Sequence, residues 1–451
     1  MIISVCLTIA LCASMIFIMI LIKKNRLSRK EVSSLKKILA DMSKSLKDTE
    51  TIPTVGSKPA GVTDTLAAAA SAPGTPSLLK QKVMSLVAKY RKDITEEDLP
   101  KVQAELKAFF DAQPRQPYYL MMDRRYEKED KRLVIIGDTH CDYNSLAALF
   151  EKLSLSEYDY FEKATFIFLG DYLDRGWILF EYLMLLVGFK KLLGDRCILM
   201  KGNHELIQYK EETGKLESLV YPSQTCPTLN DYCGTDKEFL AKFANYFSTL
   251  PYYILLKTSK GTDLLVHGGI PRDVVMDKCT ISHESGEMLV SGGDQVREMA
   301  LENMIWADPR KEKFKLQGGG SRFEFGQDQF EQFAAANKID RIFRSHEPVE
   351  NGVESFFGDR LFTIFSNGGT KNSSTGYPEV ENPVFAIMGL EGEVRFESIF
   401  FKKVTVSEGR YTTLNSLLYM EEKAEGDFSL DLEDLHLNNE FYVINQPIDK
   451  V

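Results

Sequence analysis

Four apolar runs that each end in a cluster of polar residues constrain this sequence more than any other feature. The runs comprise residues 132–137, 165–170, 197–202 and 264–269. Each has the length and composition of a buried β-strand. Helical stretches at 143–153 and 177–193 separate the first three runs, which is the βαβ pattern of a parallel sheet. The sequence therefore predicts an α/β fold whose polar clusters meet in one crevice outside the carboxyl ends of the strands.

Further strands are expected nearer the C-terminus. They comprise residues 340–345, 361–366, 383–390 and 393–401. Because no long helix separates these strands, we expect a second, mostly antiparallel sheet that packs on the first.

The N-terminus reads as a membrane anchor. Residues 2–22 are uncharged and mostly apolar, roughly the length needed to cross a bilayer. Lysines and arginines follow at once, and no charged side chain precedes the run. The positive-inside rule then places the rest of the chain in the cytoplasm, as a single-pass membrane protein. The alternative is cleavage of the N-terminus and export of the remaining chain.

The other boundaries follow from changes of composition. The predicted parts are a transmembrane anchor at 1–22, a basic juxtamembrane helix at 23–50, a flexible linker at 51–77, a helical lead-in at 78–128, the main domain at 129–405 and an acidic tail at 406–451. The seven cysteines are an odd number without the spacing of a disulfide framework, which indicates reduced thiols in a cytosolic domain. No CxxC pair suggests a zinc site.

Charge is spread unevenly along the chain. The formal net charge is −10, yet residues 23–48 hold nine Lys/Arg against three Asp/Glu, and residues 1–22 hold none. The residues from 49 onward therefore carry a net charge of −16. An acidic main domain argues against binding to nucleic acid. The short basic segment is better explained by a membrane surface.

The polar clusters at the strand ends carry metal-type ligands. They are Asp138-Thr-His140, Asp171-Tyr-Leu-Asp174-Arg175, Asn203-His204-Glu205, His267-Gly-Gly and Ser345-His346-Glu347. Carboxylate, imidazole and amide groups without a thiolate suit Mn²⁺, Fe or Zn²⁺. Four of the six histidines lie in these clusters, whereas His283 and His436 do not and are interpreted as ordinary structural residues.

The number of candidate ligands predicts two ions. One ion needs three or four protein ligands, so six or seven candidates indicate a pair of ions about 3.5–4 Å apart. A carboxylate such as Asp171 could bridge them. A water between two such ions loses a proton near neutral pH and becomes a nucleophile.

Five motifs, in this order, resemble those of the PPP-type serine/threonine protein phosphatases, within the calcineurin-like metallophosphoesterase superfamily. They are GDTHCD, GDYLDRG, KGNHE, HGGI and RSHE, and WADP (306–309) and FEFG (323–326) resemble later blocks of the same family. The resemblance covers roughly residues 130–400. It implies a β-sandwich flanked by helices, and hydrolysis of phosphoserine and phosphothreonine in proteins without a phosphoenzyme.

The resemblance also implies a role for each matching residue. Two divalent ions would be bound, with Mn²⁺ preferred and Fe or Zn²⁺ as alternatives. The first ion would be held by Asp138, His140 and Asp171. The second ion would be held by Asp171, Asn203, His267 and His346. Substrate phosphate would be bound by Arg175, Asn203 and Arg322. His204 would protonate the leaving alkoxide, and Asp174 would orient His204.

Three departures from the family pattern put substrate preference in doubt. Cys141 replaces the usual glycine after the first histidine, which would crowd the site or offer an oxidisable thiol. The second phosphate-binding arginine usually lies a few residues before Arg322, in what is here the glycine run 318–320. The segment SNGGT (366–370) replaces a loop that usually carries a tyrosine.

Two other functions stay open at this point. The chain could hydrolyse small phosphorylated molecules such as dinucleoside polyphosphates, or it could be an inactive membrane-bound scaffold. The expected partners of the favoured function are a phosphoprotein substrate and, through the N-terminal helix, a membrane.

Overall fold

The computed structural model describes residues 76–91, 94–176, 178–369, 376–377, 379–399, 403–406 and 410–413, the last two segments by their backbone alone. The predicted anchor at 1–22 and juxtamembrane helix at 23–50 lie outside the described residues, as do nearly all of the linker and most of the acidic tail. Within the described part of the chain, no helix is long and apolar enough to cross a membrane.

The predicted βαβ units form a five-stranded sheet in the order β17-β16-β2-β3-β4. Its strands are β2 (Leu133–Ile136), β3 (Thr165–Phe168), β4 (Cys197–Leu199), β16 (Val384–Met388) and β17 (Val394–Ser398). Strands β2, β3 and β4 are parallel, and β16 pairs antiparallel with both β2 and β17. Helices α5 (Tyr143–Ser154) and α7 (Leu179–Leu193) make the crossovers at the predicted places.

The second sheet has six strands in the order β1-β7-β8-β13-β15-β14. They are β1 (Tyr119–Asp123), β7 (Tyr253–Thr258), β8 (Gly261–Val266), β13 (Arg341–Arg344), β14 (Val353–Phe356) and β15 (Leu361–Ile364). The prediction of a mostly antiparallel sheet is wrong, because three of the five pairings are parallel.

The same prediction misplaced β16 and β17, which belong to the first sheet. Every residue of β16 is buried. A strand that is apolar on both faces carries no alternation to show which sheet it joins.

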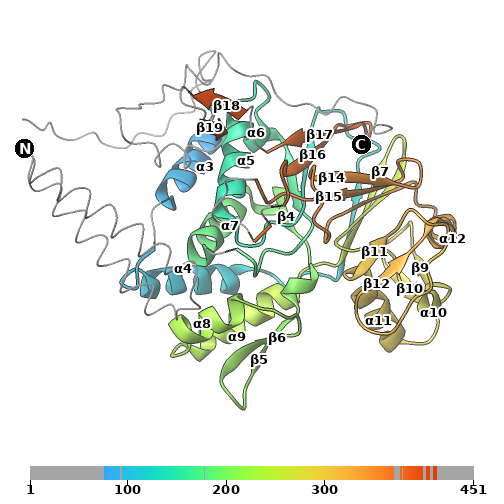
Figure 1. Ribbon diagram of the computed structural model, residues 1–451, viewed down its shortest axis with the longest axis horizontal. Coiled ribbons are helices and arrows are strands. Elements are labelled where there is room, and N and C mark those ends of the chain that lie inside the picture. The colour runs from blue at the N-terminus through green and yellow to red at the C-terminus, as the bar shows by residue number, and fades with distance from the viewer. Residues whose placement is uncertain are drawn as a thin grey trace, which may run out of the picture. The chain divides into compact units, whose positions relative to one another are not determined.

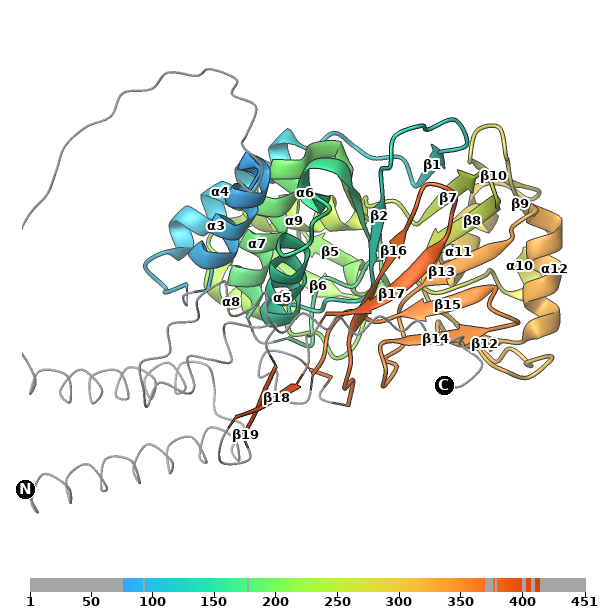
Figure 2. The same ribbon diagram turned by 90° about the horizontal axis from the view of Figure 1, so that it is seen from above.

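The two sheets pack face to face, and helices cover both outer faces (Figure 2). Alternation along β2 shows the layering: Leu133 and Ile135 belong to the apolar core between the sheets, whereas Val134 and Ile136 belong to the core under the helices. The helices on that side include α5 and α7 (Figure 1). The predicted β-sandwich flanked by helices is confirmed.

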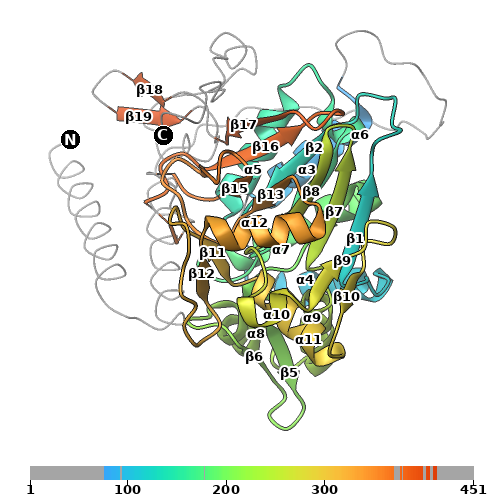
Figure 3. The same cartoon turned by 90° about the vertical axis from the view of Figure 1, so that its right-hand side faces the viewer.

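The other outer face is covered by three short helices with two small strand pairs (Figure 3). The helices are α10 (Asp273–Met276), α11 (Asp294–Met304) and α12 (Gln327–Asn337). The strands are β9 (Cys279–Ile281) with β10 (Met288–Val290), and β11 (Ala307–Pro309) with β12 (Phe323–Phe325).

The lead-in at 78–128 is helical only in its first part. Helices α3 (Leu78–Lys89) and α4 (Leu99–Ala112) bury Val83, Val87 and Leu106 against the helical layer. Residues Tyr119–Asp123 form β1 instead, because their backbone pairs with β7 at the edge of the second sheet. A strand fixed by such a long-range pairing has no helical period to predict it from.

The remaining elements join or extend these layers. They are α6 (Tyr160–Lys163), η1 (Gly194–Arg196), η2 (Asn203–Glu205), β5 (Ile207–Lys210), β6 (Lys215–Ser218), α8 (Thr225–Cys233), α9 (Lys237–Ser248), β18 (Lys403–Val406) and β19 (Arg410–Thr413). Strands β5 and β6 form an antiparallel hairpin, as do β18 and β19, which lie where the acidic tail was predicted to begin.

Candidate dimetal site

The polar clusters meet where the carboxyl ends of the strands of both sheets converge. A single parallel bridge between Asp138, just after β2, and Phe365, just after β15, joins the two sheets there. The Gly137 amide also donates to Ser366 Oγ at 2.7 Å. The loops after β2, β3, β4, β8 and β13 therefore open onto one place, as the sequence predicts.

Asp171 lies at the centre of this place, between two imidazoles. Its Oδ2 is 3.4 Å from His140 Nε2 and 3.3 Å from His267 Nε2. Both histidines donate from Nδ1 to a backbone carbonyl, at 2.7 Å and 3.0 Å, so Nε2 is the nitrogen of each ring that faces the site. One carboxylate oxygen facing two such nitrogens is suited to a bridging ligand.

Asp138 and His346 lie at the same place and have buried atoms with no partner. The Asp138 Oδ1 atom accepts from the His346 amide at 3.1 Å and from Ser345 Oγ. Among the described residues, its Oδ2 and both ring nitrogens of His346 are buried without a hydrogen-bond partner. Buried polar atoms are rarely left unsatisfied, so these three atoms fit metal ligation.

The ligand atoms fall into two groups that share Asp171. One group is His140, Asp171 and His204, and the other is Asp171, His267 and His346; the ligand atoms of each lie within 4.8 Å of one another. Asp138 Oδ2 is 3.5 Å from His140 Nε2, beside the first group, and Asn203 Oδ1 is 3.1 Å from His267 Nε2, beside the second. The donor set and its division fit two divalent ions.

His204 differs from the other histidines because a carboxylate holds it. Its Nδ1 donates to Asp174 Oδ2 at 2.7 Å, which leaves only Nε2 available. The other oxygen of Asp174 accepts from Ser223 Oγ and from two backbone amides at 2.8–2.9 Å. Burial opposes ionisation of Asp174, but the hydrogen bond from His204 holds the pKa of this carboxyl below its usual value.

The electrostatics of the ligands follow from burial and close pairing. Burial opposes ionisation of Asp171, yet the charges of His267 and His204 hold its pKa well below the usual range. Burial favours neutral His140, but the Asp138 carboxylate 3.5 Å from its Nε2 and the charge of Asp171 raise the pKa of His140 to about 9. A metal ion would have to displace this proton, so metal binding releases protons here.

The two predicted phosphate-binding arginines have different surroundings. Arg175 follows Asp174 directly, and its amide donates to Gln224 Oε1 at 3.0 Å. Its Nε is buried with no partner among the described residues. Arg322 donates from Nε to Asp308 Oδ2 at 2.6 Å, and Asp308 Oδ1 is 3.9 Å from His346 Nε2. Its side chain remains 52% exposed at the rim of the second metal group.

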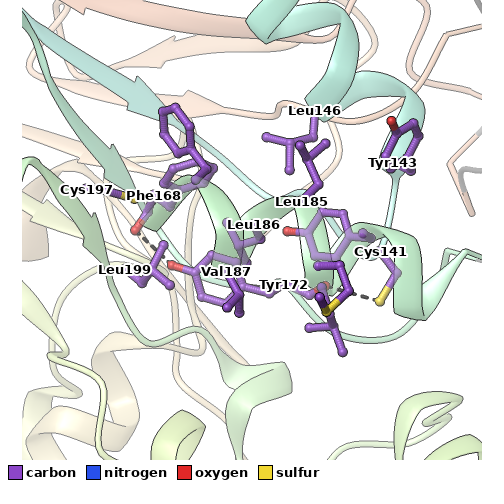
Figure 4. Close-up of a cluster of buried hydrophobic side chains, with 14 of the residues drawn as sticks. Cys141, Tyr143, Leu146, Phe168, Tyr172, Leu185, Leu186, Val187, Cys197 and Leu199 are labelled. Carbon is purple, nitrogen blue, oxygen red and sulfur yellow. Dashed lines mark hydrogen bonds between the residues drawn. The ribbon is translucent and has the colours of Figure 1, made fainter. Parts of the chain in front are cut away.

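Cys141 is neither in the site nor at the surface. Its side chain points into the core under the helices, near Tyr172 and Leu185 (Figure 4), and its thiol donates to the Tyr172 carbonyl at 3.3 Å. Burial, with the nearby charge of Asp174, raises the pKa of the thiol well above its ordinary value. An exposed, oxidisable thiol at this position is therefore excluded.

A tyrosine reaches the site although SNGGT lacks one. The hydroxyl of Tyr377 lies 3.3 Å from His140 Nε2, and its ring packs edge-on against Phe365. A Cβ on the preceding Gly376 would lie 2.8 Å from the Arg175 carbonyl, so this segment runs directly over the arginine. The motif SNGGT gives no sign of Tyr377, which lies seven residues beyond its end.

Unfavourable backbone conformations concentrate at the same place. Six residues with side chains have positive φ here: His140, Cys141, Asp171, Asp174, Arg175 and His346, with φ between 40° and 75°. Each such residue costs about 1–3 kcal/mol, and sites of this kind gather at functional centres. The surrounding hydrogen bonds therefore hold the ligands in positions that the local sequence disfavours.

This β-sandwich and its two groups of candidate metal ligands, which share Asp171, are typical of a phosphoesterase. Residues 131–350 match the calcineurin-like phosphoesterase family. This part of the chain is thus a calcineurin-like metallophosphoesterase domain.

Its relatives are serine/threonine protein phosphatases. The phosphatase 4 catalytic subunit of Kluyveromyces lactis is 28% identical over 250 residues, which are 55% of this chain and 72% of that protein. Human serine/threonine-protein phosphatase 5 is 29% identical over 242 residues, which are 53% of this chain and 43% of that protein. A yeast phosphatase structure described as similar to human PP5 has a TM-score of 0.49 at 21% identity, over 70% of this chain and 93% of that one.

Proposed function

We propose that this chain hydrolyses phosphoserine and phosphothreonine in proteins at a centre of two divalent ions. The observation that carries the proposal is one carboxylate, Asp171, shared by two groups of metal ligands beside a buried His204–Asp174 pair. The relatives that carry the names of serine/threonine protein phosphatases support the substrate class. Carboxylate and imidazole ligands favour Mn²⁺, with Fe or Zn²⁺ as alternatives.

The first ion would be held by Asp138, His140 and Asp171, and the second by Asp171, Asn203, His267 and His346. When bound, the two ions supply an activated water and neutralise charge on the phosphoryl group. The side chains of the site orient the phosphate and provide the proton that the departing serine or threonine oxygen requires.

His204 is the proposed proton donor. Its Nδ1–H is fixed by Asp174, so a proton on Nε2 is the one that can move to the leaving oxygen. The Asp174 carboxylate holds the His204 ring in place because its other oxygen is itself fixed by Ser223 Oγ and two backbone amides.

Arg175 and Arg322 are the proposed phosphate ligands. The Arg175 guanidinium can contact two phosphate oxygens through its fork of N–H groups. Arg322 donates through Nε to Asp308 and, at 3.4 Å, through one terminal nitrogen to Glu347, so the other terminal nitrogen of this half-exposed side chain is the one proposed to contact phosphate at the rim. Asn203, in η2 after β4, is the third proposed phosphate ligand and also a proposed ligand of the second ion.

The test compares substrates on one preparation of the chain. We expect Mn²⁺-dependent turnover of a phosphoserine and phosphothreonine peptide panel, and much slower turnover of dinucleoside polyphosphates. Faster turnover of the dinucleoside polyphosphates would favour the small-molecule alternative. No turnover across Mn²⁺, Fe²⁺ and Zn²⁺ would favour an inactive scaffold.

We also propose, from the sequence, that residues 2–22 hold the catalytic domain at the cytoplasmic face of a membrane. The support is the uncharged run and the basic residues that follow it. Removal of residues 1–30 should release the enzyme and leave turnover of a small aryl phosphate unchanged. When protease is added outside sealed membranes, the domain should stay intact. Cleavage of the domain by that protease, or a mature N-terminus beyond residue 22, would contradict this assignment.

A further inference from the structure

We propose that Glu205 is a positioning residue that fixes Asp171 between the two metal groups, an inference that rests on the proposed dimetal centre. Glu205 ends the short helix η2 and is fully buried. Its Oε2 accepts from the amides of Asp171 and Gly202, at 2.8 and 2.9 Å. Its Oε1 accepts from the amide of Tyr172 at 2.9 Å. Three backbone donors from two loops thus converge on one carboxylate.

These hydrogen bonds fix both peptide groups that flank Asp171. The Asp171 backbone has φ of 55°, a left-handed conformation that a residue with a side chain adopts only when its surroundings impose it. Because Glu205 binds the amides of Asp171 and Tyr172, it holds this conformation from both sides. The side chain of Asp171 is aimed at the metal groups only while that conformation lasts.

The same carboxylate joins the loop after β3 to the loop after β4. The two loops are in backbone contact, since a Cβ on Gly170 would lie 2.4 Å from the Gly202 nitrogen, and one on Gly202 would lie 2.4 Å from the Asp171 nitrogen. The His204 amide completes the junction by donating to Asp171 Oδ1 at 2.9 Å. Glu205 therefore sets the distance between Asp171 and the neighbouring Asn203.

Neither close analogue of glutamate can make this contact. Glutamine has one acceptor oxygen, and its NH₂ group would face a backbone N–H. Aspartate keeps the charge but is one methylene shorter, so its oxygens cannot reach all three donors at once. Since Asp171 belongs to both groups, either substitution should weaken both ions together. Loss of an ordinary ligand such as His346 should weaken one ion only.

The experiment measures Mn²⁺ binding to the full chain, so its result does not depend on any substrate. Titration calorimetry and metal analysis are applied to wild type, Glu205→Gln and Glu205→Asp. The matched control is Glu181→Gln, which alters another buried carboxylate that accepts a backbone amide, from Ile94 at 2.5 Å, on α7 and outside the two metal groups. Circular dichroism reports folding.

We expect both Glu205 variants to bind both ions 10–100-fold more weakly, the usual effect of removing a group that orients a ligand. The control should keep wild-type affinity. In Mn²⁺-saturated samples, the magnetic coupling between the ions, read by electron paramagnetic resonance, should change in Glu205→Asp.

Wild-type affinity in both Glu205 variants would overturn the proposal. Equal losses of affinity in the Glu205 variants and in Glu181→Gln would also overturn it, because they would indicate general destabilisation. Failure of both Glu205 variants to fold would make the residue a determinant of folding and not a positioning residue. Absence of Mn²⁺ binding to wild type would instead remove the dimetal centre itself, and the proposed function with it.

Discussion

Replacement of His204 by alanine is the sharpest test of the chemistry, because the geometry allows two roles. A ring nitrogen of His204 lies within 4.8 Å of ligand atoms of His140 and Asp171, so His204 could be a metal ligand. Its Nδ1 is bound to Asp174, as expected for a proton donor. If His204 is a metal ligand, its replacement should remove a metal ion; if it is a proton donor, metal content should stay unchanged.

As a general acid, His204 should contribute about 10²–10⁴-fold to turnover. That range corresponds to about 2.7–5.4 kcal/mol of activation free energy, at 1.36 kcal/mol for each factor of ten. The upper half of the range is expected, because the imidazole is nearly buried and its partner Asp174 keeps four hydrogen bonds on its two oxygens. A buried, fully oriented donor cannot easily be replaced by solvent.

The assay follows turnover of phenyl phosphate and of nitrophenyl phosphate, with metal content measured on the same samples. His204→Ala should slow phenyl phosphate more than nitrophenyl phosphate, because the nitrophenolate leaves without a proton. Two ions per chain should remain. His283→Ala is the control, since His283 contacts the Asn337 carbonyl and lies in neither metal group. Loss of a metal ion, or equal slowing of both substrates, would refute the role of proton donor.

Five further changes test other parts of the site. Asp171→Asn should abolish activity and remove both ions, which metal analysis would detect; retention of either ion would contradict a shared ligand. Arg175→Ala should lower kcat/KM by about 10–150-fold, from the loss of about 1.5–3 kcal/mol of charge-assisted hydrogen bonding, and Arg322→Ala by less, because Asp308 already holds that side chain. Gly202→Ala should destabilise the fold by about 1–3 kcal/mol in a thermal melt, because its Cβ would lie 2.2 Å from Asp171 Oδ1. Tyr377→Phe should reduce kcat/KM by no more than about tenfold with metal content unchanged, and a larger loss would show that the hydroxyl contacts the reacting phosphate.

The sequence by itself determined the ligand chemistry and the strands that deliver it. Strands β2, β3 and β4 could be predicted because short apolar runs alternate with helices, and their ends could be predicted to meet because parallel strands share an edge. Asp171 is one of the carboxylates that could bridge two close ions, and the resemblance of GDYLDRG to the PPP-type phosphatases assigns it to both. These are properties of local composition and order, which a sequence states directly.

Only the tertiary structure decided what depends on contacts between distant segments. Strand β16 joins the first sheet, and Tyr377 reaches His140 from 237 residues away, because each contact is made across the fold and leaves no periodic trace in the sequence. Cys141 shows the same limit: its place beside His140 suggested a thiol in the site, but a positive φ turns the chain and sends the side chain into the core. Local sequence names the groups that can react, and the backbone conformation imposed by packing decides which of them face one another.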